Sequence, residues 1–128
     1  MKLKLLATLL LCGSAWSLNA QETPLWLRKN AISPDGKSVA FCYKGDIWVV
    51  GTEGGRALQV TTNQAYDSDP VWTPDSKQIV FSSNREGSKD IWRVSAEGGK
   101  PKRLTAYPGN EIPKAVRADG SVVFLASI

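Results

Sequence analysis

The chain has 128 residues, with 16 Lys or Arg, 12 Asp or Glu and no histidine, which gives a formal net charge of +4. The absence of histidine excludes Ser-His-Asp and Cys-His catalytic arrangements within these residues and removes the commonest zinc ligand. The basic residues are scattered among carboxylates and form no basic stripe, which argues against nucleic acid as a partner.

The N-terminus has the layout of a secretory signal peptide. Lys2 and Lys4 precede an apolar run over residues 5–11, and small and polar residues follow as far as Ala20. A bilayer span needs about 20 apolar residues, so this run is too short to remain as a transmembrane anchor. We predict a signal peptide over residues 1–20, a periplasmic or secreted mature chain, and no membrane contact after cleavage. Loss of the two lysines leaves 14 basic residues against 12 acidic ones, so the net charge falls from +4 to +2.

The two cysteines have different predicted fates. A lipoprotein would be acylated at Cys12, but that site needs a small residue before the cysteine and Leu11 stands there, so lipidation is disfavoured. Cleavage removes Cys12 and leaves Cys42 alone, and a single cysteine cannot form an internal disulfide. Cys42 follows Phe41 in a strand-like run, which predicts a small apolar core residue and not a reactive thiol.

The mature sequence repeats itself. Residues 32–41 match residues 72–81 at an offset of 40. Further along, residues 46–61 match residues 90–105 at an offset of 44. The four additional residues fall in the polar stretch 82–89, which predicts a lengthened hairpin loop.

A third copy opens at residues 116–124, and a period of about 40 to 45 residues is typical of propeller blades. No segment has a helical period. β-branched and aromatic residues between turn formers predict four strands in the first unit. These strands are expected near residues 27–32, 38–42, 46–50 and 57–61.

The predicted fold is therefore an all-β partial β-propeller of about two and a half four-stranded blades. We expect the first blade at residues 21–66, the second at 67–111 and the start of a third at 112–128. Closed propellers have about four to eight blades, so we expect this chain to be a truncated piece of a longer protein. Alone it should expose blade faces and strand edges, be marginally stable and tend to associate.

Several aspartates recur at fixed repeat positions. Asp35, Asp75 and Asp119 occupy the same turn, where a carboxylate bonds nearby backbone, so a turn role is favoured over catalysis or calcium binding. Asp46 and Asp90 each precede an Ile-Trp pair, where they are predicted to accept backbone or hydroxyl hydrogen bonds at the hairpin entrance and to fix the strand register.

The segment Asp67-Ser68-Asp69-Pro70 could offer two oxygens to calcium, but that ion takes six to eight and the other ligands are missing. We therefore predict no catalytic, cofactor-binding or metal-binding residue in the chain. Trp48, Trp72 and Trp92 lie beside aliphatic residues in strands, which favours packing between blades over carbohydrate stacking.

Three repeated elements carry a family resemblance: Ser-Pro-Asp-Gly-Lys at 33–37, Asp-Ile-Trp at 46–48 and 90–92, and Glu-Gly-Gly at 53–55 and 97–99. They resemble the WD-like propeller repeats of the periplasmic TolB protein and of tricorn-type peptidases. The passage from residues 23–28 almost directly into the first turn is similar to the opening of exported tricorn-like serine peptidases. TolB places a separate α/β domain between its signal peptide and its propeller, and this sequence has no room for one.

The resemblance implies a function that the residues themselves do not show. In the tricorn-like family the N-terminal propeller is followed by further β structure, a PDZ domain and a processing-type peptidase core that supplies the nucleophilic serine. No position here matches the peptidase motifs, so the implied role is substrate access and gating in proteolysis, with unfolded polypeptides and the remaining blades as partners. Two alternatives stay open: a non-catalytic periplasmic protein-binding propeller similar to TolB, and the propeller cap of a prolyl-oligopeptidase-like hydrolase.

Overall fold

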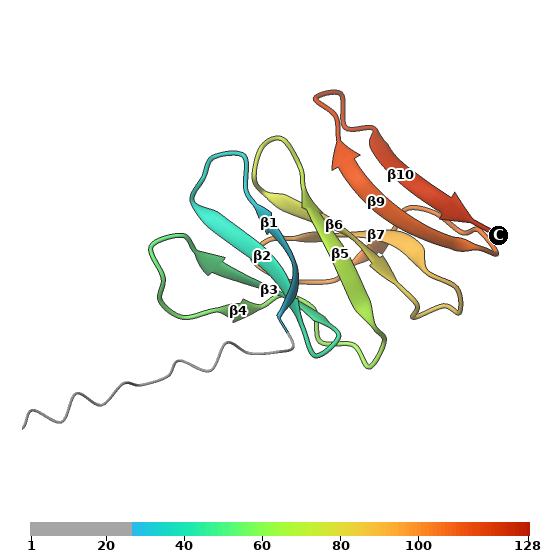
Figure 1. The fold of residues 1–128 in the computed structure, drawn as a ribbon, viewed down its shortest axis with the longest axis horizontal. Helices are drawn as coiled ribbons and strands as arrows, with labels where there is room; N and C mark the ends of the chain where they lie inside the picture. The colour runs from blue at the N-terminus through green and yellow to red at the C-terminus, as the bar shows by residue number, and fades with distance from the viewer. Residues whose placement is uncertain (1–26) are drawn as a thin grey trace, which may run out of the picture.

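The computed structural model of the protein describes residues 27–128, which form ten β-strands in three antiparallel sheets (Figure 1). The first sheet contains β1 (Arg28–Ile32), β2 (Ser38–Tyr43), β3 (Asp46–Gly51) and β4 (Leu58–Gln59). The second contains β5 (Asp67–Trp72), β6 (Gln78–Ser83), β7 (Asp90–Ser95) and β8 (Lys102–Arg103). The third contains β9 (Asn110–Val116) and β10 (Val122–Ser127). The predicted signal peptide at residues 1–20 lies outside the described residues, and residues 27–128 contain no helix long and apolar enough to cross a membrane.

Each sheet follows the order of the chain, so every strand pairs with its neighbour in sequence and each four-stranded sheet is one blade. The first strands of the three sheets, β1, β5 and β9, lie along one another in sequence order, whereas β4 and β8 contact only their own sheets. The blades therefore converge on the edge formed by β1, β5 and β9 and diverge toward β4 and β8 (Figure 1). This confirms the predicted all-β partial propeller. The division of the chain into domains at 66/67 and 111/112 stays a prediction.

The fourth strand of each complete blade is much shorter than the sequence predicts. Only Leu58–Gln59 pairs in the first blade, where residues 57–61 were expected. At its end, Thr61 Oγ1 accepts the Ile47 N–H at 2.9 Å, and Thr105 Oγ1 accepts the Ile91 N–H at the same distance in the second blade. A side-chain hydroxyl thus takes a ladder position that a backbone carbonyl would fill, and regular pairing ends there.

The turn between the first two strands of each blade is closed by an aspartate, as predicted. Asp35 Oδ1 accepts the Ser33 hydroxyl at 2.6 Å and the Lys37 N–H at 3.0 Å. Asp75 accepts the same two bonds from residues 73 and 77, and Asp119 takes both from residue 121. The hydroxyl bond first, and the backbone bond second, lower the pKa of all three carboxyls because both stabilise the ionised form.

The hairpin between the second and third strands differs between the blades. In the first blade, Lys44 and Gly45 form a two-residue turn with φ of 52° and 83°, the backbone that a type I′ hairpin requires. In the second blade, residues 84–89 form a loop that is four residues longer, which confirms the predicted insertion. The predicted start of that loop was wrong, because Ser82 and Ser83 still pair in β6 and are fully buried.

The hydrophobic core lies between the first and second blades and not within either sheet. Its first-blade members lie on or just after β2, β3 and β4, and its second-blade members come from β5, β6 and β7. They are Ala40, Cys42, Ile47, Val60, Trp72, Ile79, Phe81, Trp92 and Val94. Burying one large apolar side chain contributes about 1.5–3 kcal/mol, so this cluster outweighs the hydrogen bonds between the blades. Cys42 is confirmed as a small apolar core residue.

Two of the three tryptophans pack between blades as predicted. Trp72 and Trp92 belong to the core, and Trp72 Nε1 donates to the Ala31 carbonyl of the first blade at 2.8 Å. Trp48 alternates with the core residue Ile47 along β3, so it lies on the opposite face, which no described blade covers. The prediction for Trp48 therefore stays a prediction. The repeat fixes the face on which a side chain lies, whereas a neighbouring blade decides whether that face is buried.

Replacement of Trp72 by Phe should lower the free energy of unfolding by about 1–2 kcal/mol more than replacement of Trp48 by Phe. Both changes exchange an indole for a phenyl ring. Only Trp72 loses a hydrogen bond, because the buried indole N–H of Trp48 has no partner among the described residues. Urea denaturation of the two variants measures the difference, and equal losses would contradict a role for the bond between the blades.

Replacement of Thr73 by Val should raise the pKa of Asp75 toward its ordinary value, because the hydroxyl bond is the largest cause of its lowering. A carboxyl whose folded pKa is lowered stabilises the fold above its unfolded pKa, and this contribution is lost as the pH falls through the folded pKa. The variant should therefore lose less stability on acidification. NMR titration of the side-chain carboxyls measures this, with Asp35 as the internal control that must not move.

Candidate functional site

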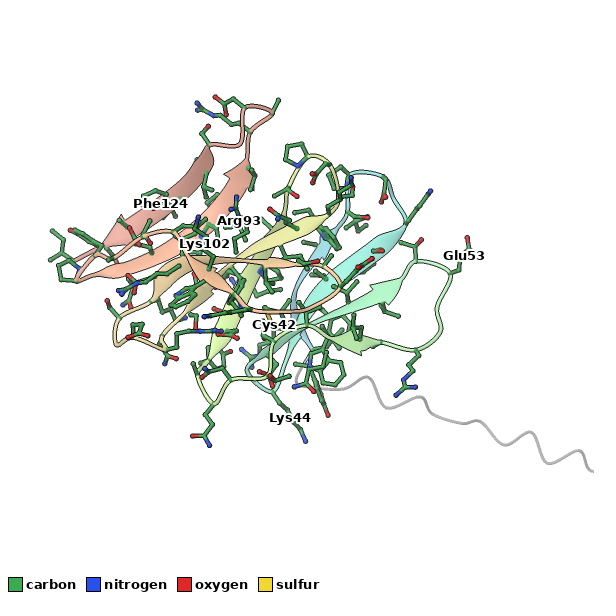
Figure 2. The ribbon with its side chains drawn as sticks, turned by 180° about the vertical axis from the view of Figure 1, so that it is seen from behind. Cys42, Lys44, Glu53, Arg93, Lys102 and Phe124 are labelled. Atoms are coloured by element: carbon green, nitrogen blue, oxygen red, sulfur yellow. The ribbon has the colours of Figure 1, made fainter. Side chains whose placement is uncertain are left out.

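The residues most often used for covalent or metal chemistry are engaged structurally here. Among residues 27–128, no group of three or more Cys, Asp or Glu side chains could hold a metal ion. Burial raises the pKa of the Cys42 thiol to about 11, so the thiol is protonated at neutral pH, and it lies inside the molecule (Figure 2). The carboxylates of the three turns each accept a hydroxyl hydrogen bond within the turn; they belong to Asp35, Asp75 and Asp119.

Asp46 and Asp90 hold the third and fourth strands of their blades together. Asp90 accepts from Arg103 Nη2 at 2.7 Å and from the Tyr107 N–H at 3.1 Å, and Asp46 accepts from Gln59 Nε2 at 3.0 Å. Burial is the main reason that the pKa of the Asp46 carboxyl is raised. The predicted structural role is supported, and the predicted backbone donor is found for Asp90. The other donors are side chains of the fourth strand and not hydroxyl groups. Gln59 and Arg103 occupy the same repeat position on the outermost strands, which lie within reach of these carboxylates.

Asp67 is fully buried and forms an ion pair with Arg85 from the long loop of the second blade. Arg85 Nη2 lies 3.0 and 2.9 Å from the two carboxylate oxygens of Asp67. The same guanidinium lies over the rings of Trp92 and Phe81, at 4.7 and 5.6 Å from the ring centroids. Asp67, one of the two carboxylates considered as calcium ligands, therefore already has Arg85 as its cationic partner.

The long loop of the second blade, residues 84–89, is fixed at several points. Arg85 points inward to Asp67, and Asn84 Oδ1 accepts the Tyr66 N–H at 2.7 Å. Ser88 Oγ donates to the Tyr107 carbonyl at 2.8 Å. Residues 86 and 87 remain exposed between these anchors. The loop therefore offers little free surface to a partner.

The first strands of the three sheets, β1, β5 and β9, are called the innermost strands below. Each has an irregularity that the sequence analysis missed. The antiparallel register skips Lys29 and Asn30 in β1, Asp69 and Pro70 in β5, and Lys114 in β9, so each strand carries a β-bulge at the same repeat position. A bulge bends a strand, leaves groups out of the ladder and redirects side chains. A proline inside a strand is typical of such a site, so Pro70 in β5 and Pro113 in β9 were the available sequence signals.

Two bulge residues adopt strained backbone conformations. Lys29 and Asp69 have φ of 56° and 55°, in the left-handed region that costs a residue with a side chain about 1–2 kcal/mol. Their side chains form an ion pair between the first and second blades, with Lys29 Nζ 3.1 Å from Asp69 Oδ1. Because Lys29 is largely exposed, this pair contributes at most about 1 kcal/mol and does not offset the strain at both positions.

A shallow hollow of about 200 Å³ opens beside these bulges, and we call it the bulge hollow. It is lined by residues of all three innermost strands, among them Lys29, Asn30, Asp69, Pro70 and Lys114. Two ammonium groups, one carboxylate and one amide therefore meet where the three blades converge. Such a surface can bind a polar chain segment through side-chain hydrogen bonds and charge.

Replacement of Arg85 by Met should lower the free energy of unfolding by about 3–5 kcal/mol, because it leaves the Asp67 carboxylate buried without a partner. Addition of Asp67→Asn to the same chain should restore much of this loss. The control is Lys89→Met, which removes a cation over the exposed Tyr66 ring and should cost little. Urea denaturation of the three variants measures the effect, and a small loss for Arg85→Met would show that the pair does not anchor the loop.

The sequence is similar to those of several known proteins. Tricorn protease homolog 1 of Streptomyces coelicolor is 34% identical over 97 residues, covering 73% of this chain and 9% of the relative. Dipeptidyl-peptidase 5 of Porphyromonas gingivalis is 30% identical over 97 residues, covering 68% of this chain and 14% of the relative. The chain thus spans a small part of the length of these curated relatives.

Solved structures show the same fold. The structure of a putative TolB from Agrobacterium tumefaciens superposes with a TM-score of 0.72 at 29% identity, covering 79% of this chain and 38% of that one. The crystal structure of the tricorn protease superposes with a TM-score of 0.66 at 21% identity, covering 77% and 10%. The family profile of the tricorn protease N-terminal β-propeller domain matches residues 24–128, and the chain belongs to this family.

Proposed function

We propose that the chain is the propeller part of an exported, tricorn-like serine peptidase, in which it admits and filters unfolded polypeptide substrates. The peptidase chemistry belongs to another part of the parent protein, because the chain contains no histidine and its described cysteine is buried and protonated. Export through residues 1–20 to the periplasm or medium is part of this proposal.

One observation carries the proposal. The innermost strands of three successive blades lie side by side, and their bulged, polar segments line the bulge hollow. We call the surface formed by these segments the innermost wall. The facing surfaces of the first and second blades are occupied by core packing, and the long loop is fixed by Arg85, whereas Lys29, Asn30 and Lys114 on this wall are exposed. An extended polypeptide exposes backbone and side-chain polar groups that such a wall can bind.

A second candidate is a non-catalytic protein-binding propeller similar to TolB. The superposition on the putative TolB of Agrobacterium tumefaciens favours it. A propeller cap of a prolyl-oligopeptidase-like hydrolase is favoured by the similarity to Dipeptidyl-peptidase 5. The reading frame beyond codon 128 separates the three: a PDZ domain and peptidase core support the first, further blades and then a stop support the second, and Gly-x-Ser-x-Gly with a later histidine supports the third.

Replacement of Asn30 by Trp should weaken binding of a fluorescently labelled, unfolded polypeptide about tenfold or more, because a bulky ring on the wall costs at least one favourable contact. The control is Glu53→Trp, in the exposed turn between β3 and β4 on the far side of the blade (Figure 2). Fluorescence anisotropy measures both affinities. Equal affinities of the two variants would remove the innermost wall from the proposed function.

A further inference from the structure

The bulge hollow carries more positive than negative charge. Lys29 and Lys114 line it with a single carboxylate, Asp69, which Lys29 already neutralises at 3.1 Å. Lys114 is exposed and forms no ion pair with any residue in the described part of the chain. One ammonium group therefore faces solvent beside a neutralised pair.

The other carboxylates on the innermost strands are Asp67 and Glu111. Asp67 on β5 is fully buried and bound to Arg85. Glu111 on β9 is buried and accepts the hydroxyl of Thr105. Neither carboxylate forms an ion pair with Lys114.

The lining of the hollow offers side-chain donors. Pro70 and Pro113 supply no N–H group, whereas Lys29, Asn30 and Lys114 each carry a side-chain donor. Asn30, left out of the strand ladder by the bulge, supplies an amide that can donate and accept. A flexible ammonium beside a neutral amide is suited to a carboxylate with an adjoining peptide group.

We propose that the bulge hollow binds the carboxylate of an aspartate or glutamate side chain in an unfolded polypeptide, with Lys114 as its charged partner and Asn30 as its neutral one. The assignment rests on the proposed function and adds a sequence preference to it: acidic segments are retained and basic segments are disfavoured. A charge-assisted hydrogen bond is about twice as strong as a neutral one, which makes this preference measurable even at an exposed site.

The test uses peptides with acetylated N-termini and amidated C-termini, so that the only carboxylates are those of side chains. One labelled peptide carries glutamates in a Gly/Ser sequence, a second carries glutamines at the same positions and a third carries lysines. We expect the glutamate peptide to bind the full chain about tenfold more tightly than the glutamine peptide, and the lysine peptide to bind most weakly. The preference should shrink as salt is added, because exposed charges are screened.

Three variants locate the effect. Lys114→Gln should remove most of the preference for the glutamate peptide over the glutamine peptide. Lys102→Gln, which changes an exposed lysine on β8, should leave that preference unchanged (Figure 2). Asp69→Asn should strengthen glutamate-peptide binding several-fold, because it frees Lys29, and asparagine tolerates the left-handed backbone at this position. A gain of affinity cannot result from misfolding.

The outcomes separate the inference from the proposed function. If the glutamate and glutamine peptides bind equally, the proposed function stands and the carboxylate site is refuted. Equal effects of Lys114→Gln and Lys102→Gln would also refute it, since the preference would then come from net charge. Absence of binding for every peptide would overturn both the carboxylate site and the proposed function.

Discussion

Packing of one sheet face against the next is the constraint on which the rest of this fold depends. A sheet with two apolar faces cannot bury them with its own turns, so each blade needs a neighbour on both sides. β6 in the second blade shows the result: Ile79 and Phe81 face the first blade, Val80 lies on the other face, and all three are buried. Strand order, turn types and the hydrogen bonds between blades all serve to bring such faces together.

Equivalent residues in different blades show that burial is decided by the neighbours. Val80 is 1% exposed, whereas its counterpart Val123 on β10 is 39% exposed, and Phe81 is fully buried while Phe124 is 39% exposed. The side chains are identical, but the sheet of β9 and β10 is flanked on one face and has two strands. The exposed apolar side chains of β10 are of the same kind as those that the second blade buries. Packing of another sheet against β10 would bury them.

Features that depend on local sequence could be predicted, and features that depend on a second strand could not. The aspartate turns follow from residues two apart, and the longer hairpin followed from a change of offset in the repeat. The partner of Asp46 lies on β4, and the exposure of Trp48 depends on a neighbouring blade. The bulges were missed because a bulge is two residues of one strand opposite one residue of the partner strand. The repeats within the sequence do not show which residues pair.

The bulges then raise the question of why charged residues occupy strained positions. Strands that converge on one edge must bend, and a bulge bends a strand, so convergence alone explains an extra residue in β1, β5 and β9. It does not explain lysine at φ of 56° in β1, because glycine, asparagine or aspartate adopts that backbone at lower cost. The ion pair between Lys29 and Asp69 is too exposed to offset the strain. Strain that packing does not require is typical of sites where the side chains serve binding, and here it falls on the wall where three blades meet.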